Sequence, residues 1–396
     1  MTLQFATPSP HWPRRAMRAC LAALATVTAA LTATSALAQV GFTQMEFNGL
    51  PVTLVYPTRA KASKLAIGAF EIEVAVDAPL APSAAGRRHL IVTSHGTAGS
   101  ALPDHGVAAA LARAGFVVAQ PMHAGDNWRD GSKAGPEAWR TRPAEVLRVI
   151  DALAADPRWG AQLHFDRVGV HGTSAGGSTG LSLAGAQWSV LTMLQHCGTN
   201  IEADLGFCFT GAPDAAEQAK RRATFERVRD VPAAYLPAEI TAWHGGRSPA
   251  MPATGSARTV GSPAGSPSPA PAFDARPDAR IASVSLAVPV AAIFSAESLA
   301  RVQVPVGLVA AQADEWLAPH FHSGHVLRHC TSCTLLADLP GATHFDVMQP
   351  WPAAAGAEVA RRQMWGATTN PAFDTRLRDE AYARVVKFHL QHLGAN

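Results

Sequence analysis

One short stretch of this sequence has the residue types and spacing for nucleophilic chemistry. Gly172-Thr173-Ser174-Ala175-Gly176 reads G-x-S-x-G, between an apolar run at residues 167–171 and a run of small residues that turns helical. In such a nucleophile elbow, a serine occupies a strained turn between strand and helix and exposes its hydroxyl. Side chains two residues before and after it would collide, so both positions take glycine. The alternative is a glycine-rich turn in an unrelated α/β domain, because the pattern alone is weak.

A serine nucleophile needs partners, and two later residues fit. The hydroxyl requires a general base, and the base requires an orienting carboxylate. With this type of elbow, the partners follow the serine in the order acid, then histidine, after strand ends. Asp314 follows an apolar run at residues 306–310, and His344 follows a short strand through a turn containing Pro340 and Gly341. We predict Asp314 as the acid and His344 as the base.

Other carboxylates lie near these positions. Glu315 directly follows Asp314 and is the nearest competitor for the acid role. Asp346 is so close in sequence to His344 that we expect it to cap a local turn. An aspartate after a strand is more often a turn residue, and a lone histidine is more often structural. The joint placement of Asp314 and His344 after Ser174, each at a predicted strand end, favours the catalytic interpretation.

Two backbone N–H groups are candidates for an oxyanion hole. One donor in this arrangement comes from the residue after the nucleophile, here Ala175. Ser94-His95-Gly96-Thr97 ends another predicted strand, and the N–H of Thr97 would supply the second donor. Loss of one such donor typically costs about 3 kcal/mol of transition-state stabilisation.

The surrounding sequence predicts alternating strands and helices that position these residues. The expected strands are residues 51–56, 70–76, 90–94, 116–120, 167–171, 281–288, 305–310 and 334–336. The expected helices are residues 107–114, one starting at Pro143, one from Ser174 to about Gln195, residues 220–229 and residues 378–393. The first two strands suggest an antiparallel beginning of the sheet. The later alternation implies a mainly parallel sheet covered by helices on both faces.

The strand–helix alternation breaks between residues 197 and 278. We interpret this segment as a cap or insertion after the helix that is expected to start at Ser174. Residues 245–272 are dense in Pro, Gly, Ser and Ala, with almost no large apolar residue. Such a composition buries too little surface to order itself, so we expect disorder there.

The N-terminal 38 residues resemble a signal peptide. Arg14, Arg15 and Arg18 precede an Ala- and Leu-rich run at residues 21–31, and Ala36-Leu37-Ala38 supplies small residues for cleavage. The expected mature domain is therefore 39–396, in the periplasm or secreted. An N-terminal membrane anchor is the alternative. No other stretch is long and apolar enough to span a bilayer.

Bulk composition limits the possible partners. The formal net charge of the 396-residue chain is +3, and the three arginines of the N-terminal segment account for that excess. With only 16% charged residues, the remaining chain offers no basic surface for nucleic acid or an acidic partner. Hydrophobic residues make up 48% of the chain, which is enough for a sizeable core.

Four cysteines follow the N-terminal segment. An even number in an exported chain favours disulfides, and the spacing suggests Cys197 with Cys208 and Cys330 with Cys333. A zinc or redox site at the C-x-x-C pair is the alternative, but no second pair lies nearby.

Two further sets of residues have competing interpretations. His320, His322, His325 and His329 could place imidazoles on one helix face as a metal site, although a polar helix surface is the simpler reading. Trp128, Trp139 and Trp316 fall near loops at the predicted catalytic edge. These tryptophans could line an acyl pocket or simply pack in the core.

Several motifs together resemble a known group. Residues 94–97, 123–127, 166–177 and 339–346 look like bacterial α/β-hydrolases known as predicted dienelactone hydrolases, which in turn resemble platelet-activating-factor acetylhydrolases. The similarity covers most of residues 40–390. It implies an α/β-hydrolase fold, a Ser174–Asp314–His344 triad, and Thr97 with Ala175 as the oxyanion hole. The pair Cys197 and Cys208 also looks like one found in this group.

The chain departs from these relatives at two points. Authentic dienelactone hydrolases use a cysteine nucleophile where this chain has Ser174, so the lactone substrate is not carried over. The plasma acetylhydrolases take their acid just after the strand corresponding to residues 281–288, where this chain has Ala287-Val288-Pro289 and no carboxylate. The phospholipid substrate is therefore not carried over directly either.

These observations predict an exported serine esterase that needs no cofactor or metal and acts on small-molecule esters. Alternatives are an amidase or peptidase with the same triad, an acetylhydrolase of phospholipid-type esters, and a catalytically silent binding module. We expect short acyl chains, because the segment 197–278 offers only scattered large apolar side chains for covering a long one.

Overall fold

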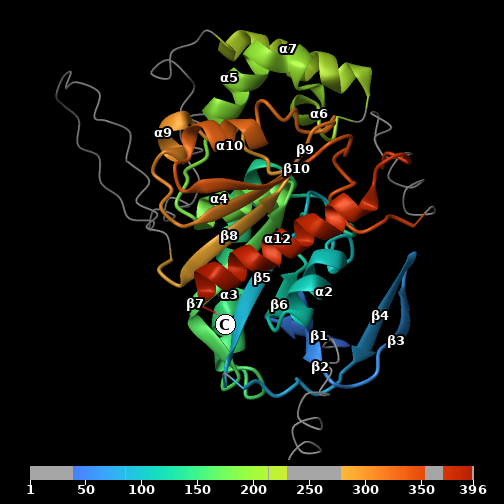
Figure 1. Ribbon diagram of the computed structural model, residues 1–396. Helices are drawn as coiled ribbons and strands as arrows, with labels where there is room; N and C mark the ends of the chain where they lie inside the picture. The colour runs from blue at the N-terminus through green and yellow to red at the C-terminus, as the bar shows by residue number, and fades with distance from the viewer. Residues whose placement is uncertain (1–38, 85, 213, 230–277, 353–368, 395–396) are drawn as a thin grey trace, which may run out of the picture. The chain divides into compact units, whose positions relative to one another are not determined.

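A computed structural model describes residues 39–84, 86–212, 214–229, 278–352 and 369–394 (Figure 1). The predicted signal peptide and the predicted disorder of residues 245–272 lie outside these ranges. The described strands are β1 (Gln39–Phe47), β2 (Leu50–Thr58), β3 (Ser63–Ile67), β4 (Phe70–Val76), β5 (Arg88–Ser94), β6 (Val117–Pro121), β7 (Leu163–Thr173), β8 (Ile281–Ala287), β9 (Val306–Ala311) and β10 (Cys333–Leu339).

These strands form one mixed sheet in the order β10-β9-β8-β7-β5-β6-β2-β1-β4-β3. Neighbours from β10 to β6 are all parallel, whereas β2 pairs antiparallel with both β6 and β1. The expected mainly parallel sheet with an antiparallel beginning is therefore confirmed. Because parallel strands end at the same edge, the residues that follow β5, β7, β9 and β10 are brought together there.

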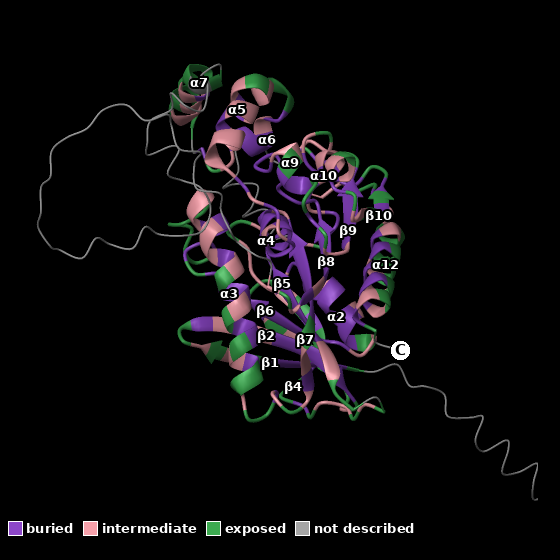
Figure 2. Ribbon diagram, turned by 90° about the vertical axis from the view of Figure 1, so that its left-hand side faces the viewer, coloured by how far each residue is buried: buried purple, intermediate pink, exposed green. Residues whose placement is uncertain are grey.

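The described helices are α2 (His105–Arg113), α3 (Pro136–Ala155), α4 (Ala175–Leu183), α5 (Val190–Asn200), η1 (Ile201–Ala203), α6 (Leu205–Cys208), α7 (Ala215–Arg229), α9 (Ala296–Leu299), α10 (Ser323–His329) and α12 (Thr375–Leu393). Figure 2 shows α3 and α4 on one side of the sheet, with α2 and α12 on the other. The expected covering of both faces by helices is confirmed.

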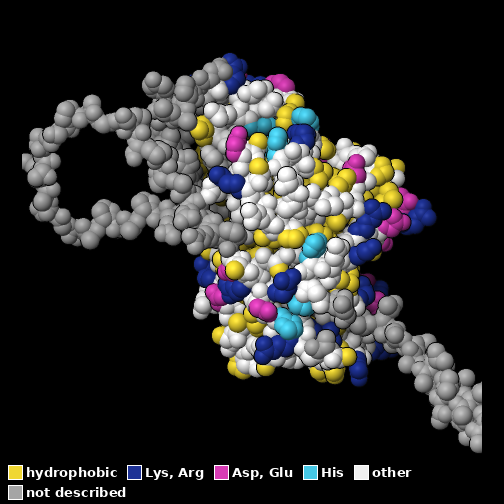
Figure 3. Space-filling view, turned by 60° about the vertical axis from the view of Figure 1, so that its left-hand side comes forward, with side chains coloured by type: hydrophobic (Ala, Val, Ile, Leu, Met, Phe, Trp, Pro, Cys, Tyr) yellow, Lys and Arg dark blue, Asp and Glu magenta, His cyan; other side chains and the backbone are white. Residues whose placement is uncertain are grey.

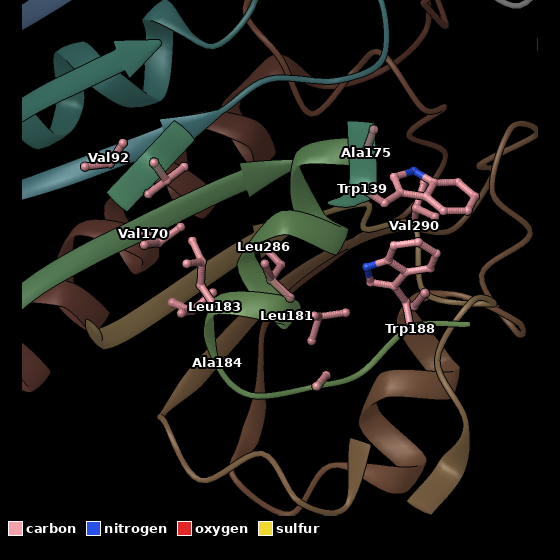
Figure 4. Close-up of a cluster of buried hydrophobic side chains, with 14 of the residues drawn as sticks. Val92, Trp139, Val170, Ala175, Leu181, Leu183, Ala184, Trp188, Leu286 and Val290 are labelled. Carbon is pink, nitrogen blue, oxygen red and sulfur yellow. The ribbon is translucent and has the colours of Figure 1, made fainter. Parts of the chain in front are cut away.

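Strand alternation explains the two apolar layers. Neighbouring residues of β5 point to opposite faces, so Val92 packs on the α3 and α4 side while Ile91 packs on the α2 and α12 side. In the first layer, Val92, Val170 and Leu286 of three adjacent strands contribute to the cluster shown with Leu181 of α4 in Figure 4. These strands read as continuous apolar runs because both faces are buried.

The start of α3 differs from the prediction. The helix begins at Pro136 rather than Pro143, which lies inside it. Pro136 occupies the first turn, where a missing N–H costs nothing. Pro143 removes one interior hydrogen bond, but burial of Val146, Ile150 and Leu153 on one face holds the helix together through that point.

The predicted long helix from Ser174 to about Gln195 is also wrong, because it is two helices. α4 ends at Leu183, and Gly185 adopts a left-handed conformation with φ of 104°. A bridge between Trp188 and Phe294 follows, and the side chain of Ser189 then caps α5. A glycine and a capping serine were the local signals for this break.

Both predicted disulfides are present. Cys197 of α5 is bonded to Cys208 of α6, and Cys330 is bonded to Cys333 at the start of β10. The first bond joins α5 to α6, which lie with α7 beyond the carboxyl edge of the sheet (Figure 1). These helices belong in part to the predicted cap segment, 197–278, whose residues 230–277 lie outside the described structure.

Surface charge is mixed. On the face shown in Figure 3, basic and acidic side chains of the described residues are interspersed rather than gathered into one patch. No helix of the described residues has the length and apolar character required to cross a bilayer.

Candidate active site

Ser174 sits at the turn between β7 and α4. Its backbone has φ of 57° and ψ of −118°, a conformation that is strained for a residue with a side chain. The position is half-buried, so the side chain remains accessible from the pocket that it lines. This is the strand–turn–helix context that a nucleophile elbow requires.

The two glycines of the elbow are sterically required. A Cβ added at Gly172 would lie 2.1 Å from the carbonyl oxygen of Gly176. A Cβ added at Gly176 would lie 1.7 Å from the carbonyl oxygen of Ser94, at the end of the neighbouring strand β5. Because both obstacles are backbone atoms, no rotamer change could relieve the collision.

The loop after β8 clamps the elbow from the other side. The N–H of Ser174 donates to the carbonyl oxygen of Ala287 (3.0 Å), and the N–H of Val290 donates to that of Ser174 (2.9 Å). Val288 between them has φ of 41°, which is unfavourable for a β-branched residue. Strain of this kind persists only where the surrounding structure imposes it.

His344 and Asp314 meet Ser174 at the carboxyl edge of the sheet. The Nε2 atom of His344 lies 3.0 Å from the Oγ atom of Ser174. The Nδ1 atom of His344 lies 2.9 and 3.0 Å from the two carboxylate oxygens of Asp314. Both the histidine and the aspartate are buried. The order serine–imidazole–carboxylate is the one in which the imidazole can accept the hydroxyl proton.

The competing carboxylates have other contacts. Glu315 accepts a hydrogen bond from the backbone N–H of His344, at 3.5 Å, and burial raises the pKa of Glu315 above its usual value. Asp346 accepts hydrogen bonds from the N–H and hydroxyl of Thr343 and from the N–H of Asn370. Asp346 therefore has the turn-capping contacts that its sequence position predicted.

The candidate oxyanion donors lie after β5 and at the start of α4. Thr97 and Gly96 line the pocket with Ser174, and a Cβ at Gly96 would lie 3.4 Å from the Cβ of Ser174. The N–H of Ala175 belongs to the first turn of α4, where N–H groups have no acceptor within the helix. A negative charge forming above Ser174 would also face the positive end of the α4 dipole.

The pocket above Ser174 has a volume of about 660 Å³. Much of its lining is apolar and largely aromatic, and includes Trp139, Met193, Phe207, Phe225, Trp316, Phe345 and Met348. From α7, the polar side chains of Glu217, Lys220, Arg221 and Thr224 also line it and lie on one helical stripe. The site can therefore hold a molecule that has both apolar and polar parts.

The three tryptophans have different environments. Trp139 and Trp316 are buried in the core clusters and also line the pocket, so both readings apply to them. Trp128 is 56% exposed, with the guanidinium of Arg129 4.8 Å from its ring centre, and does not line the pocket.

The histidines near α10 do not converge. Among the described residues, no group of three or more His, Cys, Asp or Glu side chains could hold a metal ion. His322 accepts from the N–H of Ala291 and donates to Asp204, whereas His325 bonds to the carbonyl oxygen of Phe294. The imidazoles of His322 and His325 therefore bond to different parts of the structure instead of facing one common point.

Asp204 joins α5, α6 and the acid loop, a connection that the sequence analysis missed. Its carboxylate accepts from His196 (2.7 Å) and His322 (3.0 Å) and from the N–H of Ala318 (3.1 Å). Burial alone would raise the pKa of Asp204, but the two imidazoles lower it to about 2. The helices beside the pocket are thereby tied to the loop that carries Asp314.

A second serine–histidine–carboxylate chain was also missed. Ser94 Oγ lies 2.8 Å from Nε2 of His123, and Nδ1 of His123 lies 2.7 Å from Glu145. All three are buried, and none lines the pocket, so this serine is not placed to meet a substrate. Next to it, Arg142 and Asp126 form an equally buried ion pair at 2.7 Å.

Comparison with known proteins bears on the fold. No protein-family model and no curated protein matches the sequence. The structure is similar to a ferulic acid esterase from Streptomyces cinnamoneus, with a TM-score of 0.50 and 14% sequence identity over 92% of this chain and 93% of the other. The chain therefore has an α/β fold that is also found in an esterase. At this identity the likeness concerns the fold alone.

Proposed function

We propose that this protein is an exported serine hydrolase that cleaves carboxylic esters through an acyl-enzyme. The observation that carries the proposal is the unbroken contact chain from Ser174 through His344 to Asp314, set on an elbow beside a pocket. The esterase with a similar fold supports the same reaction class. We include in this proposal that the chain is related to predicted dienelactone hydrolases and platelet-activating-factor acetylhydrolases, which its motifs resemble.

In the proposed acylation, the Oγ atom of Ser174 bonds to the ester carbonyl carbon while His344 Nε2 accepts the hydroxyl proton. Asp314 keeps the other ring nitrogen protonated and stabilises the imidazolium. The carbonyl oxygen becomes an oxyanion that accepts hydrogen bonds from the N–H groups of Thr97 and Ala175. The intermediate then expels the alcohol, which takes the proton from His344.

Deacylation repeats the same steps with water. Water adds to the acyl carbon as His344 removes one of its protons, and the second tetrahedral intermediate releases the carboxylic acid. The proton returns from His344 to Ser174, which restores the hydroxyl. The proposed reaction uses only groups of this chain and water.

We propose a preference for short acyl groups. The α7 wall contributes polar Glu217, Lys220 and Thr224 and only one described large apolar side chain, Phe225, to the pocket. A long acyl chain that reached that polar stripe would remove charged groups from water. The pocket volume exceeds the needs of an acetyl group, and we assign the remaining space to the alcohol part of the ester.

Export is the second part of the proposal. The predicted signal peptide and the two disulfides support a periplasmic or secreted protein, since disulfides persist in oxidising compartments. Mass spectrometry of the protein from a secreting host should find Gln39 as the first residue. An intact N-terminus on the exported protein would contradict cleavage at this site.

Hydrolysis of p-nitrophenyl esters from acetate to dodecanoate, beside matched anilides, tests the activity. We expect the highest kcat/KM for acetate or butyrate, a decline for longer esters and no increase when the substrate forms an interface. Rates that keep rising to dodecanoate would favour a lipase. Faster cleavage of anilides than of esters would favour the amidase alternative.

A further inference from the structure

The Arg142–Asp126 ion pair lies behind the loop that would provide the oxyanion hole. Arg142 is on α3 and Asp126 follows β6, and both side chains are about 1% exposed. Burial of two charges is costly unless further hydrogen bonds satisfy them. The contacts of this pair therefore indicate what it does in the molecule.

Those contacts hold three residues of the loop 94–98, namely His95, Gly96 and Ala98. The guanidinium of Arg142 donates to the carbonyl oxygen of His95 and, at 3.2 Å, to that of Gly96. The Oδ1 atom of Asp126 accepts from the N–H of Ala98 at 2.9 Å. The ion pair thus fixes peptide groups on both sides of Thr97.

The orientation of one peptide group follows directly. The described residues contain no cis peptide bond, so the carbonyl of Gly96 and the N–H of Thr97 point in opposite directions from one planar group. The Gly96 oxygen accepts from Arg142, from Nδ1 of His95 (2.7 Å) and from the N–H of Gly99 (3.1 Å). Arg142 is buried and does not line the pocket, whereas Gly96 and Thr97 do, so the Thr97 N–H points away from Arg142.

The loop needs this support because its conformation is unfavourable. Ala98 has φ of 53°, in the left-handed region that alanine rarely adopts. Without the carboxylate of Asp126 as an acceptor, the N–H of Ala98 would lose the hydrogen bond that helps to hold this strained conformation.

Burial, with the charge of Arg142, also holds the pKa values of His95 and His123 well below the usual range. Both rings are therefore neutral, and His95 donates from Nδ1 and accepts the His123 N–H at Nε2 (3.1 Å).

We infer that the Arg142–Asp126 pair is a positioning device for the oxyanion hole, which holds the Gly96–Thr97 peptide so that the Thr97 N–H faces the developing negative charge. This inference rests on the proposed ester hydrolysis at Ser174. It also gives a role to the motif at residues 123–127, whose Asp126 does not touch the pocket.

Two variants test the device without removing the whole pair. Arg142→Lys keeps the charge but replaces the planar fork with a single ammonium that cannot reproduce the same set of bonds. Asp126→Asn keeps an oxygen for the Ala98 N–H but removes the negative charge. Arg158→Lys is the control for the arginine-to-lysine change, because the exposed Arg158 also donates to a backbone carbonyl, that of Ala78 at 3.1 Å, and does not line the pocket.

Steady-state kinetics with p-nitrophenyl acetate and inhibition by a trifluoromethyl ketone provide the readouts. The ketone forms a tetrahedral adduct on the serine whose oxygen occupies the oxyanion hole. We expect kcat to fall about 10- to 100-fold in Arg142→Lys and Asp126→Asn, with KM within about threefold of wild type. The inhibition constant should rise by a similar factor. Arg158→Lys should match wild type in all three quantities.

Three results would overturn the inference. The first is a folded Arg142→Lys enzyme whose kcat stays within about twofold of wild type. The second is a KM that rises as far as kcat falls, and the third is an unchanged inhibition constant. Thermal unfolding shows which variants are folded. If Arg142→Lys is not folded, Asp126→Asn provides the test instead. A wild-type protein inactive on all esters would instead contradict the proposed function itself, and this inference with it.

Discussion

The Nε2 atom of His344 lies 3.0 Å from the Oγ atom of Ser174, although 170 residues separate them along the chain. Two backbone bonds connect the loop of His344 to that of Asp314, from Ala313 to Ala342 (2.9 Å) and from Gln312 to Leu339 (3.1 Å). The histidine therefore reaches the serine on a loop that is fixed to the adjacent strand end.

Ser174→Ala should abolish both ester hydrolysis and labelling by a fluorophosphonate probe, because no other hydroxyl contacts Nε2 of His344 among the described residues. Ser178→Ala is the control. Its hydroxyl is buried and bonds to the Ala175 carbonyl oxygen, so labelling should persist. Peptide mapping that finds the probe on Ser178, or labelling that survives in Ser174→Ala, would disprove the nucleophile assignment.

Asp314→Asn should lower kcat by about 10⁴-fold, with a much smaller change in KM, because an amide cannot hold the imidazole in the required tautomer. Glu315→Gln should lower kcat less than about tenfold, since Glu315 accepts from the backbone N–H of His344 and Asp314 from its imidazole. The two variants change neighbouring residues in the same isosteric way. If Glu315→Gln is the more damaging of the pair, the acid has been assigned to the wrong residue.

Gly176→Ala should destabilise the fold by about 3 kcal/mol or more, because the new methyl group would meet the backbone oxygen of Ser94. Gly131→Ala is the matched control, with nothing within 4 Å of its added Cβ. Thermal and urea unfolding of both variants measure the difference. Equal stability of the two would mean that the elbow is less tightly packed against β5 than described.

Asp104 should make stability depend on pH. This buried carboxyl accepts from the hydroxyl of Thr173, and burial raises its pKa to about 7. A raised folded-state pKa gives a stabilising contribution that is complete below the unfolded pKa near 3.8 and is lost as pH rises to about 7. Unfolding measured from pH 4 to 8 should therefore show Asp104→Asn gaining stability relative to wild type up to about pH 7. A constant difference across that range would show that Asp104 is ionised throughout.

Removal of the Cys197–Cys208 disulfide should affect both stability and the pocket. The bond closes a loop with a sequence separation of 11, so its loss should cost about 3 kcal/mol. Both cysteines line the pocket, so KM should rise more than kcat falls. Cys197→Ala with Cys208→Ala is compared with Cys330→Ala and Cys333→Ala, a pair outside the pocket lining. Equal effects on KM from both pairs would argue against a role of the first bond in shaping the pocket.

The sequence by itself indicated the features that depend on local rules. The glycines at 172 and 176 marked a turn where backbone atoms leave no room for side chains, and the apolar runs marked strands buried on both faces. Positions 94, 174, 314 and 344 each end or follow a predicted strand, so a parallel sheet was expected to bring them to its carboxyl edge. The disulfide pairs were also visible, because each pair is close in sequence.

Only the tertiary structure decided the features that depend on distant partners. Pro143 lies inside α3 because burial of one helix face outweighs one lost hydrogen bond. The sequence favoured Asp314 over Glu315 as the acid, but the contact of its carboxylate with His344 depends on which side chain the loop after β9 turns inward. The ion pair of Arg142 with Asp126 left no local pattern, since its value comes from the carbonyl groups of His95 and Gly96 that meet it in the folded chain. The sequence alone does not reveal such a buried ion pair, because the groups that satisfy its charges come together only in the folded chain.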